Sequence, residues 1–529
     1  MSSKNSQVRG GDADRNRERN SASRNRTSST DRLSSQKAKE ARRQKKLQAE
    51  RKRKREKSKK IGLVIVGIEA LLTAVFLVSL YLLNMLTLSI YGGIAAVLVL
   101  FVVYNFITQY TKHYRLFGKI FSVLLSMVML VGSIYILRTL GLFSAITGNE
   151  YKTADISVYV LETSDYETIS DLSGQTFGAW ESADKTNTSY AVEEIQSELG
   201  SAPDVTYYAD LSDMAAALYG GSVQALILNT AYVDTIEETY ETFSDDTRII
   251  ATYTNRTKIS VSSSNVSVTK ESFNVYISGI DVYGSITQTS RSDVNIIATV
   301  NPVTKEVLLT STPRDSYVEL IADDVSAGNM DKLTHAGIHG VDSSIATLEN
   351  LYDIEIDYYV RVNFSGFEDI VDALGGITIY NETAFTSNDG YYFEAGTLTL
   401  DGLHALHYAR ERKAFALGDV QRGINQMKVI KAMAEKAMSS TLLTNYLSIL
   451  NSLEGSIDTN MTQDEIGQLV QMQISEGMPS WNIDSNYVTG TSEYRYTYSM
   501  PNTKLSVYIL DEDSVAEAKE KIQAVLTGE

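Results

Sequence analysis

The fold is decided by the stretch 274–312, which reads NVYISGIDVYGSITQTSRSDVNIIATVNPVTKEVLLTST. Three apolar runs alternate with polar turns, which predicts strands over 274–280, 294–300 and 306–312. Joined as an antiparallel meander, the first strand ends at the sheet edge where the second begins, and the third returns to that edge. The prediction therefore gathers five charged residues at one end of the sheet: Asp281, Arg291, Asp293, Arg314 and Asp315.

A second charged cluster follows about a hundred residues later. Arg410 and Arg412 are two residues apart, so a strand would point them the same way. Asp419 is the expected N-cap of a helix whose apolar positions recur at helical spacing. Arg422 and Gln426 are four residues apart and share one face near its start, where anions bind favourably.

Arginine is scarce in this part of the chain, with nine between residues 141 and 529, five of them in the two clusters. An isolated Arg–Asp pair is usually a surface salt bridge of little energy. This concentration beside predicted strand ends instead favours an anion site, because the guanidinium fork matches phosphate. Two carboxylates beside it suit a hard cation such as Mg²⁺.

The N-terminal part has the opposite character. Residues 1–60 carry 22 Lys+Arg and 7 Asp+Glu, whereas residues 141–529 carry 22 and 57. The head has almost no large apolar residues and is predicted to be disordered. Three apolar segments near 61–83, 88–109 and 117–140 have membrane-spanning length. The basic head and the basic link before the third segment predict a cytoplasmic N-terminus and an outer C-terminal part.

The remaining chain alternates strand and helix patterns, which indicates an α/β (α+β) fold class with a mixed sheet flanked by helices. The polar stretch Ser260–Thr269 suggests a boundary. The predicted organisation is a disordered basic cytoplasmic head (1–60), three transmembrane helices (61–140), an outer accessory α/β domain (141–268), a larger domain (269–515) and a C-terminal tail (516–529).

Several site classes are excluded or disfavoured. The chain has no cysteine, so it has no disulfide or thiolate site. His335 and His339 are four apart, but Gly337 and Gly340 argue against a helix there; the alternative is that His335 lines the site. His404 and His407 lack an evident third metal ligand, so all four histidines are read as polar or packing residues.

With these motifs in hand, the sequence resembles the LytR-CpsA-Psr family. The resemblance covers roughly residues 270–500 and rests on motifs that occur in the family's order: Gly279–Asp281, Ser290–Asp293, Pro313–Asp315, Asp331–His335, Val362–Phe364, Asp372–Gly376, Arg410–Arg412 and Gly418–Gln426. Three spans followed by an accessory domain look like its capsule branch, often called CpsA.

The resemblance implies a phosphotransferase that moves a glycan, a capsular polysaccharide or similar polymer, from undecaprenyl diphosphate to peptidoglycan at the outer membrane face of a Gram-positive bacterium. It implies Mg²⁺, with Mn²⁺ as the alternative, held by Asp281 and Asp293. It also implies that the diphosphate is bound by Arg291, Arg314, Arg410, Arg412, Arg422 and Gln426. Asp419, Arg291 and Arg410 are the implied catalytic residues, with Asp419 as the candidate base that activates the acceptor hydroxyl.

Other interpretations remain open. A membrane-bound regulator of capsule expression would use the basic head to bind nucleic acid. The head adjoins the membrane and has no interleaved aromatic residues, which favours anionic lipid as its partner over specific nucleic acid. A polyprenyl-diphosphate hydrolase or carrier could use the same site with water or no acceptor. Other capsule-assembly proteins are further candidate partners. The family resemblance also implies that the lipid tail occupies an apolar tunnel between sheet and helices, for which the apolar face of the helix over 420–438 is a candidate wall.

Overall fold

The computed structural model describes residues 12–111, 113–147, 151–180, 184–259, 264–280, 286–416, 418–438, 449 and 455–529, with the side chains of residues 12–37 and of Asp419 left out of the description. It divides into two compact units. One comprises Met1–Tyr81 and Leu88–Ile134, and the other comprises Leu82–Thr87 and Tyr135–Glu529.

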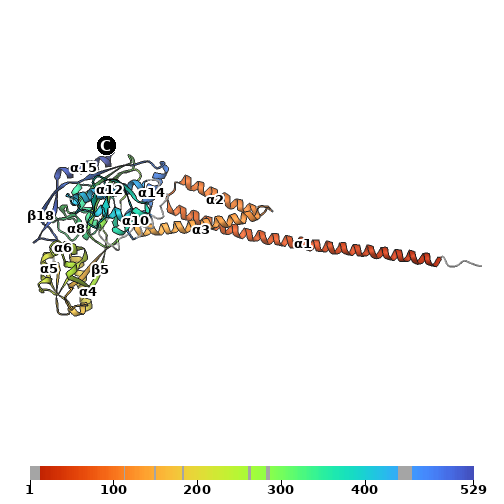
Figure 1. Cartoon of the computed structure of the whole chain (residues 1–529), viewed down its shortest axis with the longest axis horizontal. Coiled ribbons are helices and arrows are strands. Elements are labelled where there is room, and N and C mark those ends of the chain that lie inside the picture. Colours follow the sequence, from red (N-terminus) through yellow and green to blue (C-terminus); the bar gives the residue numbers. More distant parts are fainter. Residues whose placement is uncertain are drawn as a thin grey trace, which may run out of the picture. The chain divides into compact units, whose positions relative to one another are not determined.

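The first unit is helical. Three helices are long and apolar enough to cross a membrane: α1 (Asp12–Leu83), α2 (Leu88–Thr108) and α3 (Arg115–Ile146), with α3 continuing into the second unit (Figure 1). Within α1, Glu69 is buried and accepts hydrogen bonds from Asn105 Nδ2 (2.8 Å) and Ser122 Oγ (2.5 Å).

The expectation of a disordered head differs from the structure. Residues 12–60 continue the first span as one helix, α1. For residues 37–60 the physical reason lies in composition, because all of them except Ser58 are Ala, Leu, Lys, Arg, Glu or Gln, which have high helix propensity. A lack of apolar residues prevents the head from burying a core, but it does not prevent a helix.

The second unit begins with a five-stranded sheet in the order β3-β2-β4-β1-β5. Its strands are β1 (Tyr151–Leu161), β2 (Thr176–Trp180), β3 (Asp204–Tyr208), β4 (Ala225–Asn229) and β5 (Thr247–Lys258). Its helices are η1 (Ile169–Leu172), α4 (Lys185–Leu199), α5 (Leu211–Tyr219), η2 (Thr230–Tyr232), α6 (Val233–Glu237) and α7 (Phe243–Asp246). We call residues 151–258 the accessory domain.

A six-stranded mixed sheet follows, in the order β16-β11-β6-β7-β8-β17. Its strands are β6 (Phe273–Ile280), β7 (Ser292–Asn301), β8 (Glu306–Ser311), β11 (Tyr358–Asn363), β16 (Ile457–Thr459) and β17 (Asn482–Tyr487). β6, β7 and β8 form the predicted antiparallel meander, in which Gly279 lies opposite Val294. β11 is parallel to β6, and β17 is parallel to β8.

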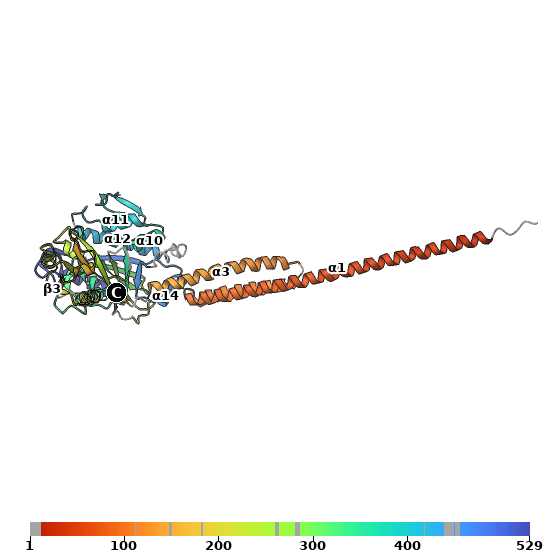
Figure 2. The same ribbon diagram turned by 90° about the horizontal axis from the view of Figure 1, so that it is seen from below.

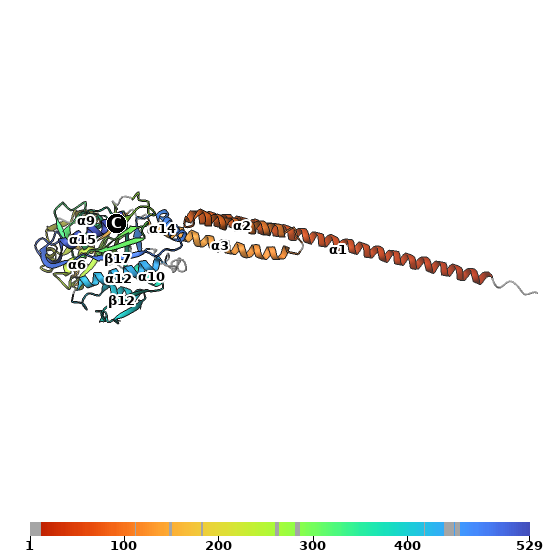
Figure 3. The same ribbon diagram turned by 90° about the horizontal axis from the view of Figure 1, so that it is seen from above.

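Helices cover both faces of this sheet, because neighbouring residues on a strand point to opposite sides. Ile297 and Leu308 pack under α9 (Val341–Tyr352) and α15 (Glu512–Thr527). Ile296 and Leu309 pack on the opposite face, toward α12 (Asp419–Ala437). Figures 2 and 3 show α12 beside α10 (Phe364–Ala373), and Figure 3 shows α9 beside α15.

The other described elements are peripheral or join the layers. They are α8 (Leu333–His339), α11 (Gly402–Arg410), α14 (Gln463–Ser475), β9 (Tyr317–Glu319), β10 (Met330–Lys332), β12 (Ile377–Asn381), β13 (Phe385–Thr386), β14 (Tyr392–Phe393), β15 (Gly396–Leu400), β18 (Gly490–Tyr496) and β19 (Lys504–Leu510).

Residues 516–529, expected to form a tail, instead contain most of α15. The helix is held by Ala518 and Ile522, which are buried and four residues apart on one face. Asp511 caps it by accepting a hydrogen bond from the backbone N–H of Asp513. The C-terminal segment is therefore part of the folded core.

Candidate active site

The two charged clusters meet around one cavity of about 220 Å³ at the predicted end of the meander. β6 and β7 contribute Gly279, Asp293 and Val294, and the loop after β8 contributes Arg314. The remaining lining residues are Arg291, Phe364, Arg410, Arg412, Arg422 and Gln426. The structure thus brings together all six residues expected to bind diphosphate and one of the two expected metal ligands.

Asp293 supplies the counter-charge at the sheet edge. Its Oδ1 accepts a hydrogen bond from Arg314 Nη1 at 2.6 Å, and both side chains are largely buried. Burial raises the pKa of Asp293, but Arg314, Arg422 and Arg291 together outweigh burial and hold that pKa below its ordinary value. Asp293 is therefore an anion held among arginines.

Asp315 extends this charge network. Its carboxylate lies 3.6 Å from Arg314 Nε and 3.7 Å from Lys332 Nζ. Burial alone would raise the pKa of Asp315, but Arg314 and Lys332 lower it below the ordinary value. Lys332 is itself buried and donates to Glu238 at 2.7 Å. Arg314, which lines the cavity, is thereby linked through Asp315 and Lys332 to Glu238 of the accessory domain.

Arg291 lies in the connection just before β7 and is only 8% exposed. Burial is the main cause that lowers the pKa of Arg291 to about 10, and Arg314 and Arg422 lower it further against the pull of Asp293. The residue remains charged at neutral pH. Its Nη2 donates to Asp234 of the accessory domain.

No pattern in the sequence points to Asp234. It lies on the short helix α6, in an acidic stretch that resembles any solvated helix face. Its partner is 57 residues away in the chain. Only the docking of the accessory domain brings the two charges together.

The expected strand around Arg410 and Arg412 is wrong. Arg410 is the last residue of helix α11, and Arg412 follows the helix. The helix forms because Asp401 accepts from the backbone N–H of His404 and because Ala405 and Ala409 bury one face. Both arginines nevertheless line the cavity, and the Arg410 guanidinium lies 4.2 Å from the centre of the Phe364 ring.

The structure places neither side chain of the two remaining predicted site aspartates, Asp281 and Asp419. Asp281 lies outside the described residues. Asp419 is the first residue of α12 and Gly418 is its N-cap, so Asp419 is one position beyond the predicted cap. The helix start still brings Arg422 and Gln426 to the cavity.

The histidine prediction was partly wrong. Residues 333–339 do form a helix, α8, despite Gly337. Gly337 fits because a Cβ there would lie 2.6 Å from the carbonyl oxygen of Ser290, so the close packing requires glycine. His335 is buried, and its Nδ1 lies 2.8 Å from Asp331 Oδ1. Among the described residues, no three His, Asp or Glu side chains form a group that could hold a metal by themselves.

A second, apolar cavity of about 410 Å³ adjoins the charged one. It lies between the sheet and the helices α10, α11 and α12. The two cavities share Gly279, Val294, Phe364, Arg410 and Gln426. Its other lining residues are Val275, Ile277, Ser278, Ala298, Val360, Val362, Asn363, Phe367, Ile370, Leu374, Leu406, Ala409, Ile430, Met433, Ala434, Ala437, Ile449 and Ile457. As expected, one wall comes from α12.

Known proteins share this part of the chain. A teichoic acid transferase of Bacillus anthracis, "Polyisoprenyl-teichoic acid--peptidoglycan teichoic acid transferase TagU", is 33% identical over 260 residues, covering 48% of this chain and 79% of that protein. The Bacillus licheniformis protein of the same name is 33% identical over 259 residues, covering 48% and 78%.

Solved structures match the same half of the chain. "TagT bound to LI-WTA" is 28% identical and covers 50% of this chain and 94% of that one, with a TM-score of 0.39. The crystal structure of B. subtilis TagU is 31% identical and covers 49% and 97%, with a TM-score of 0.37. The LytR_cpsA_psr family model matches residues 236–524, more than half of the sequence, and the chain therefore belongs to the LytR-CpsA-Psr family.

Proposed function

We propose that this protein transfers a glycan polymer from a polyprenyl diphosphate carrier to peptidoglycan. The observation that carries the proposal is the junction of the two cavities. An arginine-lined cavity suits a diphosphate, and the adjoining apolar cavity suits the hydrocarbon chain attached to it. The relatives' printed names, which join a polyisoprenyl-linked polymer to peptidoglycan, support the same reaction class.

The finer assignment is a capsular polysaccharide or similar cell-wall polymer carried on undecaprenyl diphosphate. The three apolar helices would keep the enzyme beside a membrane-bound donor. The basic head would lie in the cytoplasm against anionic lipid, and the second unit would lie outside.

In the proposed reaction, an acceptor hydroxyl attacks the phosphorus that carries the sugar. A new P–O bond forms, the bond to the bridging oxygen breaks, and polyprenyl monophosphate leaves with the bond's electron pair. Arg291, Arg314 and Arg410 would hold the diphosphate and stabilise the charge that develops on the leaving phosphate. Asp419 is the candidate that accepts the hydroxyl proton.

The site also fits a divalent cation in part. Asp293 is a buried, ionised oxygen donor at the cavity wall, which is the ligand type that Mg²⁺ prefers. Asp293 and Asp281 would hold Mg²⁺, with Mn²⁺ as the alternative. Bound there, the cation would neutralise diphosphate charge.

The test uses the full chain in detergent with a polyprenyl-diphosphate-linked glycan, with and without peptidoglycan. We expect glycan to become covalently attached to peptidoglycan and polyprenyl monophosphate to appear in equal amount. Arg291→Ala should lower the rate about 10²- to 10³-fold, the loss typical of removing one donor to developing charge. Arg495→Ala is the matched control, because Arg495 is exposed and pairs with Glu493.

Two results would contradict the proposal. One is a wild-type rate in Arg291→Ala while Arg495→Ala is also normal. The other is release of glycan phosphate at the same rate without peptidoglycan and no attachment in its presence, which would make the protein a hydrolase.

A further inference from the structure

The accessory domain reaches the charged cavity through the segment 234–238. Three of its residues contact the larger domain. Asp234 pairs with Arg291, Thr235 Oγ1 lies 3.4 Å from His335 Nε2, and Glu238 accepts from Lys332. One short segment therefore contacts Arg291, which lines the cavity, and two buried residues of the larger domain, His335 and Lys332.

This segment is fixed by its own packing. Tyr232 and Ile236 are almost fully buried. They belong to one apolar cluster that also contains Ile338, Met500 and Leu505 of the larger domain. The two domains share a core at this point, so the backbone that carries Asp234 is held in place rather than free to move with a surface loop.

Among the described residues, Asp234 is the one that accepts a hydrogen bond from the Arg291 side chain, whereas Asp293 and Asp315 act on Arg291 through charge alone. Arg291 precedes β7, which begins at Ser292, and its side chain lines the cavity. A long side chain loses rotamer freedom when it is immobilised, and an unsupported arginine bears that cost when its ligand binds.

Asp234 meets Arg291 from outside the cavity. Arg291 lines the charged cavity and Asp234 does not. Asp234 accepts from Arg291 Nη2, and a guanidinium has five N–H donors, so other donors are left for a ligand. Asp234 is also half exposed, which leaves room for the pair to persist when the cavity is filled.

We propose that Asp234 is a positioning residue, through which the accessory domain holds Arg291 ready for the diphosphate. The inference rests on the proposed function and deepens it. Asp234 lies just outside the family match, which begins at residue 236. The accessory domain would thus complete a binding site whose other residues lie in the shared domain.

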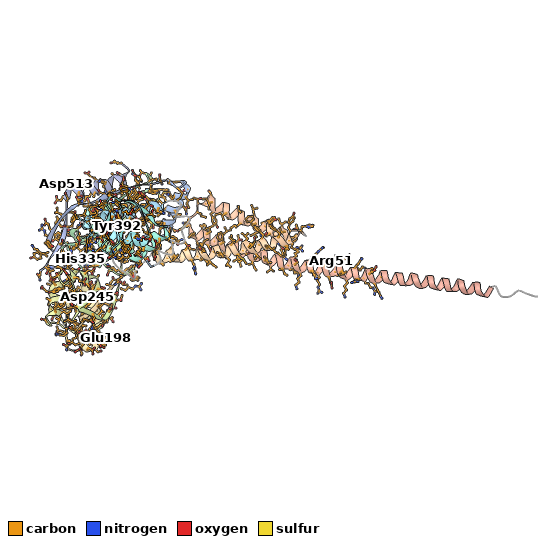
Figure 4. The ribbon with its side chains drawn as sticks, in the orientation of Figure 1. Arg51, Glu198, Asp245, His335, Tyr392 and Asp513 are labelled. Atoms are coloured by element: carbon orange, nitrogen blue, oxygen red, sulfur yellow. The ribbon has the colours of Figure 1, made fainter. Side chains whose placement is uncertain are left out.

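The experiment compares Asp234→Ala with Asp234→Asn in the full chain. The alanine variant loses the acceptor, and we expect kcat/KM for the donor to fall about three- to ten-fold, the cost of ordering one long side chain. The asparagine variant keeps a hydrogen-bond acceptor for Arg291 and should remain within about two-fold of wild type. The matched control is Asp245→Ala, an exposed aspartate of the same domain (Figure 4).

A second measurement separates positioning from a purely structural role. Inorganic pyrophosphate with Mg²⁺ is titrated into the wild type, Asp234→Ala, Arg291→Ala and the double variant by calorimetry. We expect Asp234→Ala to weaken binding in the wild-type background and to add no further loss once Arg291 is absent, because interacting residues are not additive.

The outcomes are distinct. An equal loss from Asp234→Ala in both backgrounds, or tighter pyrophosphate binding in both Asp234 variants, overturns the positioning role, and tighter binding would mean that Asp234 competes with the ligand. Unchanged binding and transfer in Asp234→Ala, with transfer abolished in Arg291→Ala, also overturns it but leaves the proposed function intact. Normal transfer in Arg291→Ala contradicts the proposed function itself.

Discussion

The buried pair of Asp293 and Arg314 predicts that Asp293→Ala destabilises the fold as well as reducing transfer. The two side chains are 15% and 13% exposed, and their charged atoms lie 2.6 Å apart. Removing one partner of a buried pair costs about 3–5 kcal/mol, because the other charge is left uncompensated. Here the remaining charge is an arginine with Arg291 and Arg422 nearby. At about 2–4 °C for each kcal/mol, Tm should fall by about 6–20 °C.

The assay is thermal unfolding of the full chain in detergent, followed by circular dichroism. Asp293→Asn should give a smaller fall, because the amide keeps the volume and can still accept from Arg314. Arg412→Ala is the comparison within the same cavity. Arg412 is exposed, so its removal should change the free energy of unfolding by less than about 1 kcal/mol while it weakens donor binding.

The reasoning is refuted if Asp293→Ala unfolds at the wild-type temperature or above it. That result would mean that the arginines repel one another too weakly to need a counter-charge. Burying the Asp293 carboxylate would then cost at least as much free energy as its ion pairs contribute. A fall of equal size in Arg412→Ala would also refute it, since burial would then not be what distinguishes the two charges.

Two further predictions concern the apolar cavity and the accessory domain. Ala434→Phe places a ring in the apolar cavity, so transfer from a long-chain donor should fall about ten-fold or more while a short-chain donor is less affected; equal losses would contradict a lipid site there. Burial raises the pKa of Asp184 to about 6, from 3.8, against the opposing effects of Asn229 and His339. Because the folded pKa is the higher one, the contribution of Asp184 to stability should fall as pH rises from about 4 to 6, by about 3 kcal/mol for a two-unit shift. In denaturant unfolding, the free energy of unfolding of wild type should therefore fall relative to that of Asp184→Asn over this range, and parallel curves would contradict the assignment.

The meander was predictable because its connections are short and its apolar runs are bounded by turn residues. β7 and β8 are joined by the turn that contains Pro302, so their pairing and the gathering of Asp293 with Arg314 followed from chain direction alone. The helix ending at Arg410 was not predictable in this way. Two arginines at a spacing of two fit a strand, and the helix depends on a cap at Asp401 and on buried Ala405.

The role of the accessory domain could not be predicted for a different reason. Strand and helix patterns describe what each segment buries, but they do not say which surfaces of two domains meet. Asp234 and Arg291 have no shared pattern, and their contact depends on the packing of Ile236 beside Ile338 and Met500. The charged residues of a site can be predicted from the sequence of one domain, whereas the residues that position their side chains can belong to another domain.

The distribution of charge shows why such support is needed. The part of the chain after residue 140 is strongly acidic, yet five of its nine arginines surround one cavity. Arginines packed this closely repel one another when no ligand is present, and the burial that makes them effective toward phosphate increases the repulsion. Asp293 and Asp315 offset it beside Arg314, and Asp234 holds Arg291 in place from the accessory domain. A substitution that removes the hydrogen-bond acceptor at any of these three positions should therefore alter anion binding through the arginines, even where the carboxylate never touches the ligand.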